Sequence, residues 1–136
     1  MENKTLNILI IEDDVAACRE LRQYIEKIET LRLAGITGDS DQGIELVKSA
    51  LPDVIILDIE LNHGTGNGIM FLAKLNALNL SLRPYILITT NNSSNVTYES
   101  ARTLGADFIK HFFKKFNTSG TNGFIFLCFG FFKELF

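Results

Sequence analysis

Short apolar runs alternate with longer segments in which apolar residues recur at helical spacing. We interpret five of these runs as β-strands, at residues 6–11, 33–37, 54–59, 85–90 and a last one that starts near residue 107 or 108. The third run is the clearest because its residues are apolar up to a single Asp. Strands that alternate with helical segments are typical of βαβ units and a parallel sheet.

The segments between the runs predict four helices. In the first, Cys18, Leu21, Ile25 and Ile28 share a face. Ser40 is positioned to cap the second, which Pro52 should end. Gly64, Gly66 and Gly68 predict a flexible loop before the third helix, and the polar turn at residues 91–94 and Gly105 mark the beginning and end of the fourth.

Strands that are apolar along their whole length must be buried on both faces of their sheet. The sequence therefore predicts an α/β fold with a doubly wound, five-stranded parallel sheet and helices on both faces. We expect the flavodoxin-like strand order 2-1-3-4-5, in which the first and third strands are neighbours.

Polar residues stand where these strands end. Glu12 and Asp13 follow the first strand, Asp58 closes the third, and Thr89 and Thr90 close the fourth. In the expected order the three carboxylates converge at the carboxyl edge of the sheet, where ligands bind in such folds. Carboxylates that share a pocket repel one another unless a cation neutralises them, and an oxygen-only ligand set suits Mg²⁺. An aspartate beside that ion can attack a phosphoryl group.

Simpler interpretations exist for each feature alone. An acidic pair before a helix commonly serves as a cap and dipole partner, and Asp14 fits that role. A single Asp at the end of a strand is commonly a turn residue. His63 in the glycine-bearing loop is best explained as a solvated side chain. The joint occurrence of the acids and Thr89 in one chain favours the phosphoacceptor site.

Composition and charge exclude several classes of function. The 136 residues fit one domain, and the net charge of −3 without a basic run argues against direct nucleic-acid binding. Cys18 and Cys128 stand apart without metal or redox spacing, and the N-terminus lacks the apolar core of a signal peptide. We therefore expect a cytoplasmic protein without a membrane span.

Four motifs together resemble the response-regulator receiver domain of two-component signalling. They are ILIIEDD at residues 8–14, DVIILDIEL at 53–61, ILITT at 86–90 and LGADFI at 104–109. The resemblance covers residues 6–109 and leaves a Phe-rich segment, 110–136, that is atypical for the family. We expect a fifth helix in this segment. On this basis we expect a single receiver domain over residues 1–136.

The resemblance implies a phosphoacceptor switch rather than an enzyme, with Mg²⁺ as cofactor. It implies that Asp58 accepts a phosphoryl group from a histidine kinase or phosphotransfer protein and that the domain then signals to a downstream protein. Asp13 would bind the metal directly, Glu12 through water, and Glu60 through its backbone carbonyl. Thr89 would turn towards the phosphoryl group, and Glu60 and Asn91 would tune hydrolysis.

The chain departs from the family pattern at two sites near this pocket. Asn62 stands where a Pro is common, in a loop about two residues longer than usual. The family also places an essential Lys seven positions after the Gly that corresponds to Gly105, and Phe112 stands there. Lys110 and Lys114 are the alternatives, and we favour Lys110 as the cation that pairs with Asp58 or the phosphoryl oxygens.

The departures leave other functions open. A degenerate pseudo-receiver that binds proteins without phosphorylation is the alternative that the displaced Lys favours. An aspartyl-phosphate hydrolase would need a D-x-D motif after the first strand, which residues 12–14 do not supply.

Ten of the eleven Phe residues lie at or beyond Phe108. An apolar segment of this kind marks a core, a homodimer contact or an altered terminus, and we favour self-association and a core role equally.

Overall fold

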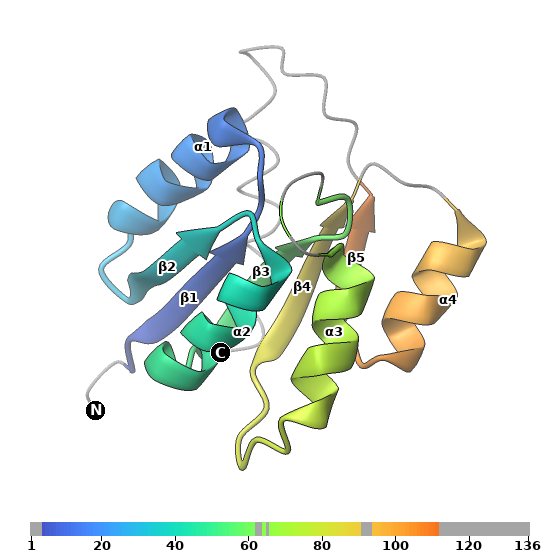
Figure 1. Ribbon diagram of the computed structural model, residues 1–136. Helices are drawn as coiled ribbons and strands as arrows, with labels where there is room; N and C mark the ends of the chain where they lie inside the picture. The colour runs from blue at the N-terminus through green and yellow to red at the C-terminus, as the bar shows by residue number, and fades with distance from the viewer. Residues whose placement is uncertain (1–3, 62–63, 65, 91–93, 112–136) are drawn as a thin grey trace.

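The apolar runs form a five-stranded parallel sheet in the computed structural model, which describes residues 4–61, 64, 66–90 and 94–111. Its strands are β1 (Leu6–Ile11), β2 (Leu31–Thr37), β3 (Val54–Asp58), β4 (Tyr85–Thr90) and β5 (Phe108–His111). Their order is β2-β1-β3-β4-β5, and every neighbouring pair is parallel (Figure 1). The predicted flavodoxin-like order is confirmed, although β2 begins two residues earlier than its pattern indicated.

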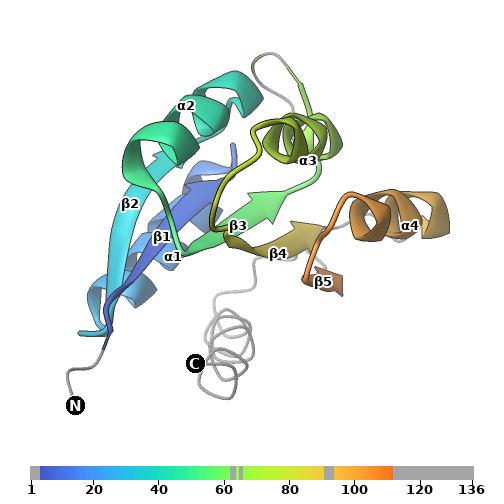
Figure 2. The ribbon, with the colours of Figure 1, turned by 90° about the horizontal axis from the view of Figure 1, so that it is seen from below.

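Four helices cover the two faces of this sheet. They are α1 (Val15–Glu26), α2 (Ser40–Ala50), α3 (Gly68–Ala77) and α4 (Asn95–Thr103). Seen along the sheet, α1 lies on one side, while α2 and α3 lie on the other with α4 beside α3 (Figure 2). The prediction of helices on both faces is confirmed. The expected fifth helix falls in residues 112–136, outside the described part of the chain.

Successive residues of β1, β3 and β4 pack into the cores on opposite faces of the sheet, as the two-residue period of a strand requires. Ile8, Ile10 and Ile56 pack against Leu21 and Ile25 of α1. The other face packs against α2, α3 and α4: strand residues that include Leu9, Ile11, Ile55 and Leu57 share a core with Phe71 and Leu72 of α3. Double-sided burial explains why the strands read as continuous apolar runs. Because the strands are parallel, their polar carboxyl ends lie at the same edge of the sheet.

The residues that cap the helices agree with the predictions for α1 but not for α2. Asp14 caps α1 as predicted, because its side chain accepts a hydrogen bond from the Ala17 amide. The predicted cap of α2 was wrong, since Asp39 and not Ser40 has the extended backbone of an N-cap and accepts from the Asp41 amide. Ser40 is the first helical residue and is fully buried. Leu51, just before Pro52, ends α2 in the left-handed conformation.

Gly68 also differs from its prediction as a loop glycine. It is the buried first residue of α3, capped by Asn67, whose side chain accepts from the Met70 amide. The Gly68 amide donates to the Ile59 carbonyl at 3.0 Å. The start of α3 therefore lies against the end of β3, which places this helix beside Asp58.

Candidate metal and phosphoacceptor site

Three acidic side chains meet at the carboxyl edge of the sheet. Glu12 and Asp13 follow β1, Asp58 is the last residue of β3, and one carboxylate oxygen from each lies within 4.8 Å of the others. Glu12 is 5% and Asp58 1% exposed, while Asp13 is half-buried. We call these residues the acidic cluster. The convergence predicted from the strand ends is confirmed.

The register of β1 against β3 creates this convergence. Ile11 pairs with Leu57, so Glu12 and Asp58 are the next residues on two adjacent strands. The Glu12 amide donates to the Thr37 carbonyl at 2.9 Å, which extends the β1–β2 pairing by one step. The Glu12 carboxylate accepts from the Asp14 amide at 3.0 Å. Glu12 is thus held at both its backbone and its side chain.

Asp58 is held by the loop that follows it. Its Oδ1 accepts a hydrogen bond from the Glu60 amide at 3.0 Å. A methyl group at Gly68 would lie 2.5 Å from the Asp58 carbonyl oxygen and 2.7 Å from Cα of Ile59. The close approach of α3 therefore requires glycine at this position, and it fixes the backbone that carries the Asp58 carboxylate.

The negative charge of the cluster extends to a neighbouring thiol. Cys18, in the first turn of α1, donates through Sγ to the Glu12 carbonyl at 3.3 Å. Burial raises the pKa of this thiol to about 11, and the carboxylates of Glu12, Asp14 and Asp13 add to the shift. Cys18 is consequently a neutral thiol at physiological pH and not a nucleophile.

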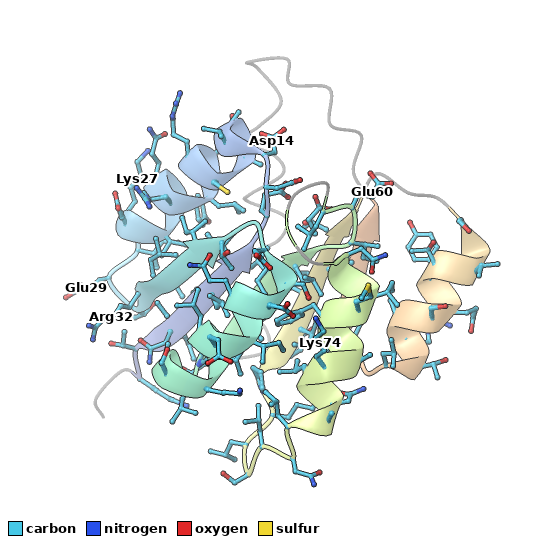
Figure 3. The ribbon with its side chains drawn as sticks, in the orientation of Figure 1. Asp14, Lys27, Glu29, Arg32, Glu60 and Lys74 are labelled. Carbon is cyan, nitrogen blue, oxygen red and sulfur yellow. The ribbon has the colours of Figure 1, made fainter. Side chains whose placement is uncertain are left out.

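The strand register brings two further predicted residues to this edge. Asp58 pairs with Thr89 of β4, and Thr89 pairs with Lys110 of β5. Thr89 is buried, with 9% of its surface exposed. Glu60 lies at the same end of the sheet as the beginning of α1, where Asp14 stands (Figure 3). Asn91 and Lys114 fall outside the described residues.

The donor set of the acidic cluster fits a hard divalent cation. It offers only oxygen atoms, two of the three carboxylates are buried, and their charges need neutralisation at these distances. Mg²⁺ binds through few carboxylates and keeps several waters. The acidic cluster has the donor atoms needed to hold Mg²⁺.

Sequence reasoning missed two glycines that shape this site, Gly38 and Gly68. Gly68 was taken as a loop residue, and Gly38 received no role. A contact between backbone segments far apart in sequence leaves no periodic signal, so only the folded structure reveals it.

The fold and the cluster define a doubly wound α/β domain with an acidic pocket at the carboxyl edge of its sheet. A sequence model of the family described as "Response regulator receiver domain" matches residues 8–120. The chain therefore belongs to the response-regulator receiver domain family, as its motifs indicated.

Individual relatives agree with this assignment. The chain is 34% identical over 100 residues to the nitrate/nitrite response regulator protein NarL of Escherichia coli K12, covering 74% of this chain and 44% of NarL. It is 32% identical over 108 residues to a protein-glutamate methylesterase/protein-glutamine glutaminase of Saccharophagus degradans, covering 78% of this chain and 30% of that protein. The chain thus spans less than half the length of these two relatives.

Solved structures share the fold. The response regulator domain of Thermotoga maritima CheB superimposes with a TM-score of 0.80 at 17% identity, covering 96% of both chains. In the described part of this chain, none of the helices has the length and hydrophobicity needed to cross a bilayer.

Proposed function

We propose that this domain accepts a phosphoryl group on Asp58 in a Mg²⁺-dependent reaction and signals through the resulting change of conformation. The observation that supports the proposal most strongly is the acidic cluster, in which Asp58 is 1% exposed and its carboxylate lies beside those of Glu12 and Asp13.

The chemistry assigned to each residue follows from its position. An oxygen of Asp58 forms a bond to phosphorus while the bond from phosphorus to the donor's imidazole nitrogen breaks, and the donor histidine leaves with that electron pair. Bound Mg²⁺ supplies charge stabilisation for the phosphoryl oxygens. Asp13 and Asp58 would bind the ion directly, Glu12 through water and Glu60 through its backbone carbonyl. The Glu60 amide holds the Asp58 carboxylate in a fixed orientation.

The remaining predicted roles concern the switch. Thr89 is the register partner of Asp58, which suits a hydroxyl that moves to meet the phosphoryl group. Lys110 is the register partner of Thr89, and this placement favours it as the cation of the pocket. Glu60 and Asn91 are proposed to tune the lifetime of the aspartyl phosphate.

Incubation of the chain with acetyl phosphate and Mg²⁺, followed by intact mass measurement, tests the proposal. We expect the parent protein to gain one phosphoryl group, the Asp58→Asn variant to gain none, and chelation of Mg²⁺ to prevent the reaction in the parent. A parent protein that stays unmodified while it binds Mg²⁺ would contradict the proposal and would support a pseudo-receiver.

The proposed partners are a histidine kinase or phosphotransfer protein that donates the phosphoryl group and a downstream protein that senses it. We propose that the chain acts as a switch rather than an enzyme, in the cytoplasm, without binding nucleic acid itself, in line with its net charge of −3.

Self-association through the Phe-rich segment 110–136 is a further proposed contact. It rests on composition alone, since ten of the eleven Phe residues lie at or beyond Phe108. Light scattering on the intact chain and on a chain that ends at Thr118 tests it. Identical monomer masses for the two would exclude the homodimer.

A further inference from the structure

The turn between β2 and α2, residues 37–40, lies directly against the acidic cluster. A methyl group at Gly38 would lie 2.9 Å from Cβ and 3.0 Å from Cα of Asp13. Real Cβ atoms do not approach other carbons this closely. The atoms in the way are Cα and Cβ of Asp13, which cannot move aside as the end of a flexible side chain could. The position of Asp13 therefore depends on the absence of a side chain at Gly38.

Backbone conformation gives no other reason for glycine at this position. Among the described residues, the glycines with positive φ are Gly64 and Gly105, and Gly38 is not one of them. An alanine at Gly38 would thus meet no conformational penalty of its own. The contact with Asp13 is the constraint that remains.

Hydrogen bonds hold the turn in place, so it cannot simply yield. The Thr37 carbonyl accepts from the Glu12 amide, and the Thr37 hydroxyl accepts from the Asp39 amide at 3.1 Å and donates to the Gln42 side chain. Thr37 is 5% exposed. Because the turn is held by these bonds, a group added at Gly38 must displace Asp13.

The turn also reaches the loop on the far side of the pocket. A methyl group at Gly64, whose φ is +83°, would lie 2.7 Å from Cγ of Asp39. The same turn therefore contacts Asp13, which follows β1, and the loop that follows Asp58 and Glu60. It is placed to hold the two sides of the metal site in register.

We infer that Gly38 is a positioning residue for the divalent cation site: its missing side chain lets Asp13 stand where it can bind Mg²⁺ together with Asp58. This inference rests on the proposed function only in its assignment of Mg²⁺ to the acidic cluster. It predicts a defect in cation affinity rather than in the phosphoryl-transfer step itself.

Calorimetric titration with MgCl₂ of the parent, Gly38→Ala and Gly35→Ala tests the inference. Gly35 is the matched control because it lies in the same strand-and-turn segment, is likewise half-buried, and would place a methyl group in ordinary contact, 3.4 Å from a Leu46 methyl carbon. We expect Gly38→Ala to raise the Kd for Mg²⁺ by about tenfold, the size typical of one methyl group forced into a packed site. Gly35→Ala should leave the Kd within about twofold of the parent value.

A second measurement separates positioning from general damage. At saturating Mg²⁺, Gly38→Ala should reach the same extent of phosphorylation by acetyl phosphate as the parent, because the excess ion restores occupancy. A lowered plateau with an unchanged Kd would mean that Gly38 serves stability alone and would overturn the inference. If Gly38→Ala does not fold, Thr37→Val decides, since it loosens the turn without adding an atom beside Asp13. A raised Kd in that variant supports the inference, and an unchanged Kd overturns it.

The result also distinguishes the inference from the proposed function. A parent that binds Mg²⁺ with the predicted Gly38 dependence, and yet gains no phosphoryl group, upholds the inference and rejects the phosphoacceptor role. A parent that binds no Mg²⁺ rejects the inference, because Gly38 then has no cation site to shape.

Discussion

Replacement of Asp13 by Asn removes one charge from the acidic cluster while keeping the shape of the side chain. The carboxylate oxygens of Glu12, Asp13 and Asp58 lie within 4.8 Å of one another. At that distance two unit charges repel by ~0.9 kcal/mol in water and by ~3.5 kcal/mol at an effective dielectric constant of about 20. Asp13 is half-buried, so the true value lies between these limits. We expect Asp13→Asn to raise the free energy of unfolding in the absence of divalent cations by about 1–3 kcal/mol.

The same substitution should abolish the response to Mg²⁺. A ligand that binds only the folded state stabilises it by ~2.7 kcal/mol at a free concentration 100 times its Kd. Urea unfolding with and without MgCl₂ measures both effects. The parent should gain stability from the ion, while Asp13→Asn should start higher and gain little.

Asp53→Asn provides the matched control at the opposite edge of the sheet. Asp53 accepts from the Asn7 amide at 2.8 Å and pairs with Lys4 at 3.3 Å, so the loss of its charge should lower stability by roughly 0.5–1.5 kcal/mol. Its response to Mg²⁺ should equal that of the parent. An Asp13→Asn variant that is less stable than the parent without divalent cations, or that retains the full Mg²⁺ response, would refute the electrostatic reasoning.

Three further predictions concern residues around the cluster. Gly68→Ala should destabilise the protein by about 1–3 kcal/mol in urea unfolding, because its methyl group would meet the Asp58 carbonyl at 2.5 Å; unchanged stability would show that α3 can shift freely. In a Cys128→Ser background, the rate at which Cys18 reacts with a thiol reagent should rise with an apparent pKa of about 11. Because the folded-state pKa lies above the ordinary value of 9.0, the free energy of unfolding should fall as pH rises from about 9 through 11. A reaction rate that rises with a pKa near 9 would contradict the burial argument. Lys110→Ala should leave phosphorylation of Asp58 possible but uncouple it from the conformational change followed by nuclear magnetic resonance, and a normal response there with a lost one in Lys114→Ala would reassign the role.

The strands and the acidic cluster were predictable because both depend on local pattern and on a general rule of topology. Residues 54–57 are apolar because helices cover both faces of the sheet. This apolar run is visible in the sequence even when the neighbours of the strand are not known. Once β1 and β3 are neighbours, Glu12, Asp13 and Asp58 must meet. The strand order itself was an expectation from the fold class, which the structure confirms.

Contacts between segments distant in sequence were not predictable. Ser40 looked like the natural cap of α2, but Asp39 occupies the N-cap position and Ser40 is packed inside. Gly68 looked like a loop glycine and Gly38 received no role, although each marks a close approach of another backbone segment. The sequence favoured Lys110 over Lys114 as the cation of the pocket, and that assignment stays a prediction: β5 pairs Lys110 with Thr89, while Lys114 lies outside the described residues.

Chemical trapping of the phosphorylated residue tests the central claim most directly. After reaction with acetyl phosphate and Mg²⁺, borohydride reduces an aspartyl phosphate to homoserine, and peptide mass spectrometry then locates the change. The account predicts homoserine at position 58 in the parent, with none there after chelation of Mg²⁺ or in Asp58→Asn. Homoserine at Asp13 or another carboxylate in place of Asp58, or no trapped residue in a protein that binds Mg²⁺, would contradict it.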